Sequence, residues 1–366
     1  MIYFDNSATG ARKPVSVLRA VRAQLRAPAN PGRSGHRRSV DALALCEETR
    51  ERAGKLCGVP PERILFSKNC TESLNLAIFG LIPDNSHIVL SQFDHNATLR
   101  PVYALCRRNH TYSVAFPENG RITARSVEKA LKKDTQTVVL NCVSNVLGCP
   151  AEVEEISALC KKKGLLLILD GAQYVGHHEI ELSSLYYTAL AAAPHKTLFA
   201  PQGIAFLAAR ELPKPLLYGG TGTASAELEQ PAEAPEGFES GTMNMPGIAG
   251  LNAGLRYYES RRAELSERLS ELCRYLYESL VKLEGIRVYS SPNAAGIISI
   301  LKEGKDSSEL SDYLSHRDIA TRSGLHCAPL VHRYLGTERS GLVRISLSPA
   351  NTAREIDKLA AALREF

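Results

Sequence analysis

The chain has 366 residues, of which 44% are hydrophobic and 23% are charged, and its formal net charge at pH 7 is +5. This composition is that of a globular protein long enough for two domains, and it excludes a disordered chain. The small, scattered positive charge argues against a nucleic-acid partner. No segment approaches the roughly 20 apolar residues of a membrane helix, and residues 1–6 lack a leader pattern, so we expect a soluble, cytoplasmic protein without a membrane partner.

The nine cysteines show neither the close spacing of a disulfide framework nor a C-x-x-C pair. Such usage is typical of a reducing compartment and gives no structural zinc site. We therefore expect reduced thiols, most of them packing residues, and no bound metal.

Short apolar runs alternate with amphipathic stretches from about residue 14 to residue 245. The expected strands are Ile64–Phe66, Ile88–Leu90, Val138–Leu140, Leu165–Leu169 and Ile204–Leu207. The expected helices are Ser39–Leu56, Ser73–Leu81, Ala97–Arg107, Ser126–Lys132 and Glu152–Lys163. This alternation predicts an α/β fold with a mostly parallel sheet wrapped by helices, in which ligands bind at the carboxyl ends of the strands.

Residues 219–241 are rich in Gly, Ala, Pro and Glu and predict a long loop. A charged amphipathic stretch over residues 248–283 then predicts a helix that leads into a second unit. That unit has expected strands at Ile297–Leu301 and Leu342–Leu347 and expected helices at Ser308–His316 and Thr352–Leu363. We expect a large domain of residues 14–250 and a smaller α/β domain made of residues 1–13 and 251–366.

Polar groups follow several of the expected strands. The loop Ser67–Ser73 offers the N–H groups of a helix start and the Thr71 hydroxyl, which suit a phosphate, although Thr71 could be a plain helix cap. His95 can stack on a flat ring and relay protons, or serve as a structural hydrogen-bonding group. Asn145 follows another strand with an amide. Since the carboxyl ends of parallel strands meet at one rim, we expect these groups to converge.

Asp170 and Lys196 form the most informative pair in the sequence. Asp170 ends an apolar strand, and Lys196 lies in a later short loop. Pyridoxal phosphate needs such a lysine to hold its aldehyde as a Schiff base, and a carboxylate to keep its pyridine nitrogen protonated. The pair predicts an enzyme that stabilises a substrate carbanion.

Two further residues carry chemistry in the second unit. Cys327 lies beside Arg322 and His326, which would be positive neighbours that favour the nucleophilic thiolate; a buried structural thiol is the alternative. Arg344 interrupts an apolar strand, where it can grip a carboxylate through two parallel hydrogen bonds or form an ion pair at the surface.

Taken in order along nearly the whole chain, these motifs resemble those of cysteine desulfurases and selenocysteine lyases, which have the class V aminotransferase fold and use pyridoxal phosphate. The motifs are Tyr3–Thr9, Asn69–Asn75, Asp94–Asn96, Ser144–Gly148, Asp170–Gln173, His195–Lys196, Ser240–Thr242, Arg322–Pro329 and Arg344–Leu347. The resemblance implies a cysteine desulfurase, a transferase of sulfur metabolism.

The resemblance also implies which residues hold the cofactor. Lys196 would form the Schiff base and move the Cα proton, Asp170 would pair with the ring nitrogen, and His95 would stack on the ring. The remaining contacts are implied for Gln173 at the ring hydroxyl and, at the phosphate, for Cys70, Thr71, His195 and a second subunit's Thr242. The last assignment implies a homodimer with shared active sites.

The substrate residues follow from the same resemblance. Arg344 and Asn145 would bind the carboxylate of the amino-acid substrate, and Arg322 belongs with them. Cys327 would attack the substrate sulfur, which leaves a persulfide on the enzyme and releases alanine. The short Cys327 motif resembles the branch with a compact loop, so we expect an acceptor protein to dock and collect the sulfur.

Two positions depart from the family pattern. Ala193 stands where the family usually has Ser, which removes one phosphate donor at a cost of about 1–3 kcal/mol of cofactor affinity, by the scale of hydrogen bonds to charged groups. Thr71 and Thr242 could compensate for this loss. Cys70 stands where the family usually has Ala, as a packing residue or an oxidisable thiol.

Three other readings share part of this evidence. Selenocysteine could replace cysteine as substrate, since selenium leaves more readily. A class V aminotransferase or lyase for another amino acid would drop the chemistry of Cys327. A non-catalytic subunit would keep only the fold, and the intact set of Lys196, Asp170, His95 and Cys327 argues against it.

Overall fold

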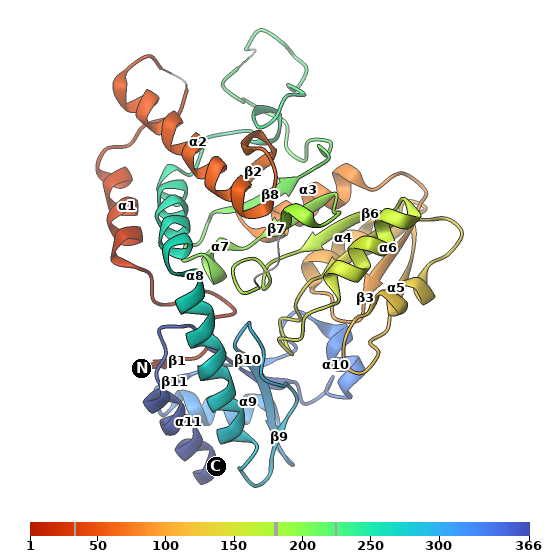
Figure 1. The fold of residues 1–366 in the computed structure, drawn as a ribbon, viewed down its shortest axis with the longest axis vertical. Coiled ribbons are helices and arrows are strands. Elements are labelled where there is room, and N and C mark those ends of the chain that lie inside the picture. Colours follow the sequence, from red (N-terminus) through yellow and green to blue (C-terminus); the bar gives the residue numbers. More distant parts are fainter. Residues whose placement is uncertain (33, 179–181, 224) are drawn as a thin grey trace.

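The computed structural model describes residues 1–32, 34–178, 182–223 and 225–366. Its largest element is a seven-stranded sheet with the strand order β2-β8-β7-β6-β5-β3-β4, flanked by helices (Figure 1). The strands are β2 (Ile64–Ser67), β3 (His87–Ser91), β4 (Thr111–Ala115), β5 (Thr135–Asn141), β6 (Leu166–Asp170), β7 (Ala189–Ala192) and β8 (Ala205–Ala209). The predicted α/β class is confirmed.

The sheet is mostly parallel, as predicted. β3 pairs in parallel with β4 and β5, and β6 pairs in parallel with β5 and β7. β8 runs antiparallel to both of its neighbours, β2 and β7. The carboxyl ends of β3, β5, β6 and β7 therefore lie at one edge of the sheet, where loops can bring polar side chains together.

The helices of this unit agree with the sequence pattern to within a few residues. They are α1 (Val15–Arg26), α2 (Arg37–Cys57), α3 (Cys70–Leu81), α4 (Asn96–Cys106), α5 (Ala124–Ala130), α6 (Val153–Lys163) and α7 (Pro194–Thr197), with single 3₁₀ turns at Pro61–Arg63, Leu182–Ser184 and Glu236–Phe238. The alternative reading of Thr71 as a helix cap is wrong. Asn69 caps α3, because its side chain accepts a hydrogen bond from Glu72 N at 3.0 Å.

Two strands of the sheet, β7 and β4, are not predicted from the sequence pattern, and each has a physical reason. β7 reads Ala-Leu-Ala-Ala, a poor match to β-branched strand composition, and its small side chains lie in the same core as α3, which packs against β7 and β8. β4 is the edge strand, and its first residues are exposed rather than buried. The expected long loop at 219–241 is observed, apart from residue 224, which lies outside the described ranges, and it contains the 3₁₀ turn at Glu236–Phe238.

The second unit is a four-stranded antiparallel sheet with the order β12-β13-β10-β9. Its strands are β9 (Ile286–Val288), β10 (Ile297–Lys302), β12 (Arg322–Gly324) and β13 (Leu342–Ser346), and its helices are α9 (Ser307–Ser315), α10 (Pro329–Leu335) and α11 (Ala353–Glu365). β1 (Ile2–Tyr3) joins this unit by pairing with β11 (Ile319–Ala320). None of the helices in the described ranges has the length and apolar character needed to cross a membrane.

Helix α8 (Met245–Leu280) joins the two units without a linker and runs down the length of the molecule in Figure 1. Its first half, including Ile248 and Leu255, is buried in the core of the large sheet. Its second half, including Leu272 and Leu276, is buried in the core of the small sheet together with Phe4. Along α8 the change from the large core to the small core falls between Leu265 and Leu269, later than the predicted boundary near residue 250. We propose that the first residues belong to the small domain, because Phe4 packs in its core.

Candidate active site

Asp170 is fixed at the carboxyl end of β6, a strand that is otherwise apolar and buried. Its Oδ1 accepts a hydrogen bond from Ala172 N at 3.0 Å, and its Oδ2 accepts one from Asn141 Nδ2 at 3.4 Å. Only 3% of the residue is exposed. A carboxylate held in this way has a fixed direction and points to the rim of the sheet, as the sequence predicts.

Lys196 reaches the same place from α7, which follows β7. Burial lowers the pKa of Lys196 below its usual value, while the negative charge of Asp170 opposes that change. The Nζ atom makes no hydrogen bond or ion pair with any residue that the structure describes. A lowered pKa increases the fraction of neutral amine, which is the form that condenses with an aldehyde.

His95 forms the third part of this cluster, as the cap of α4. Its Nδ1 accepts a hydrogen bond from Ala97 N at 3.0 Å, so the proton of the neutral ring lies on Nε2. Burial lowers the pKa of His95 to about 4, although Asp170 acts in the opposite direction. The ring is therefore neutral near pH 7 and presents a flat face beside Asp170 and Lys196.

Asp94 and Asn141 support this cluster, and the sequence reasoning assigned them no role. The Asp94 carboxylate accepts hydrogen bonds at 2.9 Å from the backbone N–H groups of Ser91 and Asn141, which ties the ends of β3 and β5 together. Burial raises the pKa of Asp94 to about 7. Two features of the sequence could have indicated this role. Asn141 ends one apolar strand, and Asp94 follows another within a few residues and directly precedes His95.

The start of α3 lies against Asp170. Cys70 Sγ is 3.9 Å from Asp170 Oδ1, and burial together with that carboxylate raises the pKa of the Cys70 thiol well above its usual value. The first N–H groups of any helix have no partner within the helix, so those of Cys70 and Thr71 are free for an anion. Thr71 itself is exposed at this helix start.

Gln173 is buried in the loop after β6. Its Nε2 donates to Ser7 O at 2.9 Å, which links the loop to the first residues of the chain. Its Oε1 is buried without a hydrogen-bond partner among the described residues. A buried polar atom without a partner marks a place where a ligand or water is expected.

The remaining residues implied for a phosphate are only partly brought together. His195 adjoins Lys196; its Nδ1 lies 3.2 Å from Thr9 Oγ1, and burial lowers its pKa to about 4. Ala193 is buried at the start of α7 and offers no side-chain cap. Thr242 is exposed and makes no hydrogen bond to any residue in the described ranges, so the structure does not bring it to this site.

Arg344 and Arg322 approach the cluster from the small sheet. They stand directly opposite each other in the antiparallel pair β12–β13, so both side chains are on one face of the sheet. Arg344 is buried; it forms an ion pair with Asp5 at 2.7 Å and donates to Asn145 O at 3.0 Å. Arg344 Nε and Asn145 Oδ1 have no partner among the described residues. Asp5 therefore orients Arg344, a role that the sequence alone does not indicate.

Cys327 lies on the short loop between β12 and α10, and its side chain is exposed. His326 and Cys327 both have left-handed backbone, with φ of +52° and +56°, which is costly for residues other than glycine. The large domain holds this conformation: Asn96 N donates to Cys327 O at 2.7 Å, and Asn145 Nδ2 donates to His326 O at 2.8 Å. The loop is compact and fixed beside His95.

The expectation of two positive neighbours for Cys327 is only half right. Arg322 Nη2 lies 3.9 Å from Cys327 Sγ and can stabilise a thiolate. His326 is buried, and burial lowers its pKa to about 3, so its ring is neutral. The ring instead stacks on His332 and hydrogen-bonds to Arg322 O at 3.1 Å, which makes His326 a support of the loop.

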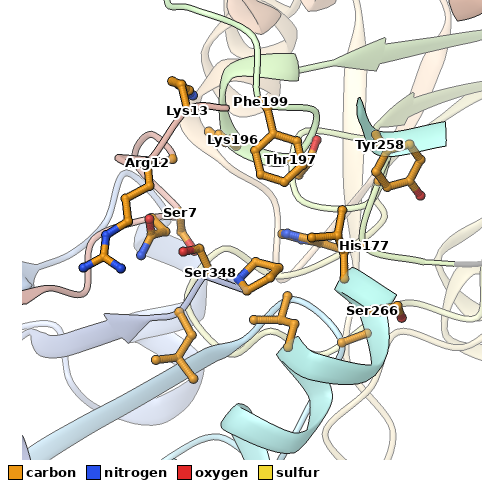
Figure 2. Close-up of a pocket in the computed structure, with 18 residues that line it drawn as sticks. Ser7, Arg12, Lys13, His177, Lys196, Thr197, Phe199, Tyr258, Ser266 and Ser348 are labelled. Atoms are coloured by element: carbon orange, nitrogen blue, oxygen red, sulfur yellow. The ribbon is translucent and has the colours of Figure 1, made fainter. Parts of the chain in front are cut away.

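A separate cavity of about 40 Å³ lies between the two domains, lined on one side by the turn that carries Lys196 (Figure 2). Lys13, Phe199 and Tyr258 are among its other lining residues, whereas His95, Asp170 and Cys327 are not. It has room for little more than water. Lys13 Nζ donates to His195 O at 2.8 Å, so this side of the turn is occupied by structural contacts.

Comparison with known proteins gives a consistent result. The chain matches the family model described as Aminotransferase class-V over residues 2–359. A probable cysteine desulfurase of Pyrococcus abyssi is 32% identical, and the match covers 100% of this chain and 94% of the relative. A cysteine desulfurase of Salmonella dublin is 30% identical, over 99% of this chain and 92% of the relative. The apo structure of a cysteine desulfurase from Thermococcus onnurineus has a TM-score of 0.92 at 32% identity, and covers 100% of this chain and 94% of its own.

Proposed function

The chain belongs to the aminotransferase class-V family, and on this premise we propose that it is a pyridoxal-phosphate-dependent cysteine desulfurase. It converts L-cysteine to L-alanine and holds the sulfur as a persulfide on Cys327. One observation carries the proposal: an exposed cysteine, with an arginine 3.9 Å from its sulfur, is fixed beside a buried cluster of lysine, aspartate and histidine.

The residues present fit pyridoxal phosphate. Lys196 Nζ has no partner among the described residues, Gln173 Oε1 is buried without one, and of the first N–H groups of α3 those of Cys70 and Thr71 remain open while that of Glu72 is capped by Asn69. Lys196 would hold the cofactor, Asp170 would face the ring nitrogen, His95 the ring face, and Gln173 the ring hydroxyl. The phosphate would be bound by Cys70, Thr71, His195 and a partner's Thr242. When bound, the cofactor supplies an aldehyde for amines and a ring that stabilises negative charge at the substrate Cα.

The substrate carboxylate binds at Arg344, with Asn145 and Arg322 beside it. Arg344 is held by Asp5, and its Nε has no partner among the described residues, so the guanidinium is oriented before substrate arrives. Lys196 Nζ then takes the proton from the substrate Cα and returns a proton to carbon at the end of the reaction. The low pKa of Lys196 suits this exchange, because the neutral amine is the proton acceptor.

Cys327 takes the sulfur. Its thiolate, stabilised by Arg322, attacks the sulfur of the substrate. A new bond forms between Cys327 Sγ and that sulfur, the bond from sulfur to the substrate Cβ breaks, and the electron pair left on carbon is protonated to give alanine. The segments that carry His95 and Asn145 both hydrogen-bond to the backbone of the loop that carries Cys327, which keeps these residues near this step.

We further infer a homodimer. Thr242 is exposed in its own chain and is not brought to its own site, which is consistent with the contribution of this hydroxyl to the phosphate of a second subunit. Light scattering is expected to give twice the mass of one chain. Thr242→Ala is expected to weaken cofactor binding without changing that mass.

Two features bear on the cellular location of the protein and on its partner. All nine cysteines are free thiols, which fits a reducing compartment, and we place the protein in the cytoplasm. The persulfide sits on a compact loop with little reach, so a sulfur-acceptor protein must come to it.

One assay tests the function. Purified protein is incubated with L-cysteine and a reductant, and alanine and sulfide are both measured; the same assay is run with L-selenocysteine and with Cys327→Ala. Alanine and sulfide in equal amounts, lost in Cys327→Ala, are the expected result. Turnover of cysteine that persists in Cys327→Ala would contradict the proposed mechanism, and turnover confined to L-selenocysteine would change the substrate.

A further inference from the structure

A groove of about 440 Å³ lies between α4, α10 and the outer strand β4. We call it the α4–α10 groove. Its aromatic side chains stand in solvent: Phe116 is 65% exposed and Tyr103 is 59% exposed, and Tyr112 and Tyr334 are exposed as well. Large exposed aromatic side chains that gather in one place mark a surface that another molecule covers.

The groove opens beside Cys327. Asn96, which lines the groove, donates its backbone N–H to Cys327 O at 2.7 Å. Helix α10, which forms one wall, begins at Pro329, two residues after Cys327, and Gln92 Nε2 fixes this helix by donating to Leu330 O at 2.6 Å. A molecule seated in the groove is therefore next to the backbone of the loop that carries Cys327.

The charged residues that line the groove are positive. Arg100 and Arg333 are exposed and line it, and no Asp or Glu is among the described residues that do so. Arg107 lies over the Tyr103 ring at 5.7 Å and extends the positive surface, whereas Arg333 is partly offset by an exposed ion pair with Glu338. An apolar floor with a positive rim is complementary to an acidic protein face that carries apolar side chains.

The outer edge of β4 is also available. Within the described ranges β4 pairs only with β3, and its sequence, Thr-Tyr-Ser-Val-Ala, has neither the Pro nor the Lys that commonly protects an edge strand. Open backbone N–H and C=O groups can bind an extended segment of another chain. This feature favours a protein over a small molecule as the occupant of the groove.

We propose that the α4–α10 groove docks a separate protein that presents an acidic, apolar face and a thiolate. The proposal rests on the proposed function, because the thiolate accepts sulfur from Cys327. It attacks the outer sulfur of the persulfide; a bond forms between the two sulfurs, the bond to Cys327 Sγ breaks, and Cys327 leaves as a thiolate. No oxidant or reductant is consumed.

Two synthetic peptides of equal length, each with one cysteine, test the proposal. One carries Asp, Glu, Phe and Leu residues; in the other, Lys replaces every acidic residue. The protein is first loaded with sulfur from L-cysteine, and the rate of sulfur transfer to each peptide is measured, with dithiothreitol as a small thiol. The acidic peptide is expected to react at least about ten times faster than the basic one at low salt, and the advantage should shrink as salt increases.

Three variants locate the effect. Phe116→Asp and Arg100→Glu, both of exposed side chains, are expected to remove the advantage of the acidic peptide without changing discharge by dithiothreitol. Val281→Asp, an exposed apolar position at the end of α8, is the matched control and should behave as the wild type.

Equal rates for the two peptides, or an advantage that survives both groove variants, would overturn the proposal. A change of molecular mass in Phe116→Asp would overturn it too, since the groove would then be an interface between copies of this chain. Failure of the proposed function has a different signature, because the wild type would then release no alanine and carry no sulfur before any peptide is added.

Discussion

Two cysteines reach the same site from different domains. Cys70 begins α3 in the large domain, is half-buried, and lies 3.9 Å from a carboxylate oxygen of Asp170. Cys327 lies on a loop of the small domain, is exposed, and has Arg322 at 3.9 Å. Burial and a negative neighbour raise the pKa of the Cys70 thiol and keep it protonated, whereas Cys327 is open to solvent and has a positive neighbour instead. The surroundings of the two thiols, rather than the residue type, distinguish them, and on this ground we propose Cys327 as the nucleophile.

The largest effect is expected for replacement of Cys327. Cys327→Ala is expected to lower alanine formation from L-cysteine by at least about 100-fold, because no other thiolate stands at the substrate sulfur. Alanine is measured under steady-state conditions, and the absorbance of the bound cofactor serves as a control for an intact site. Activity within tenfold of the wild type would mean that a different group accepts the sulfur.

Arg322→Gln tests whether the positive neighbour makes Cys327 more reactive than Cys70. Loss of the positive charge 3.9 Å from the sulfur is expected to slow the reaction of Cys327 with iodoacetamide at pH 7 roughly fivefold, by the scale of two unit charges at that distance in water. Peptide mapping by mass spectrometry gives the rates at Cys327 and Cys70 in one experiment. Cys70 should be slow in both proteins; rapid labelling of Cys70 would show that burial does not protect it.

Acid is expected to lower the free energy of unfolding, because three histidines of the site are buried in their neutral form. Burial lowers the pKa of His95 and His195 to about 4 and that of His326 to about 3, so the folded state binds fewer protons than the unfolded state below the ordinary histidine pKa of about 6.5. Stability therefore falls as pH decreases from about 6.5 toward 4, by up to about 1.4 kcal/mol per pH unit for each ring. Asp94, with its pKa raised to about 7, acts in the opposite direction and offsets one ring.

Denaturant unfolding at pH 7, 6 and 5 measures this effect. His326→Asn should show a shallower loss, since Asn tolerates the left-handed backbone at this position and carries no ring to protonate. A free energy of unfolding that is constant from pH 7 to pH 5 would contradict the neutral state assigned to these histidines.

The smallest effect is expected for Cys70→Ala. The thiol is protonated and contributes only a weak contact to Asp170, so alanine formation should stay within about threefold of the wild type. Steady-state turnover measures this, beside Cys327→Ala under the same conditions. A loss as large as that of Cys327→Ala would assign Cys70 a part in sulfur transfer.

The sequence was sufficient for those parts of the site that depend on local pattern. A short apolar run that is flanked by Gly164 and Gly171 and ends in a carboxylate is typical of a buried strand with its charge at the rim, and β6 places Asp170 there. The strand that carries Arg344 was recognisable for the same reason. Cys327 was separated from eight other cysteines by its neighbours alone, and it is the only one of the nine that is exposed.

The rest depends on contacts between distant segments. Asp5 orients Arg344 across most of the chain, and Asn96 fixes the backbone of Cys327, which no local pattern indicates. His326 is predicted from the sequence to be a positive neighbour of Cys327, yet the fold buries its ring against His332. Burial is a property of the assembled structure, so the charge state of a histidine cannot be inferred from its neighbours in sequence.

The location of the sulfur after one turnover tests the account most directly. The protein is mixed with one equivalent of L-cysteine without reductant, quenched, digested, and analysed by mass spectrometry for peptides that have gained one sulfur atom. The added sulfur is expected on the peptide that contains Cys327 and not on the peptide that contains Cys70. Added sulfur on Cys70, or alanine formed in stoichiometric amount with no sulfur on the protein, would contradict it.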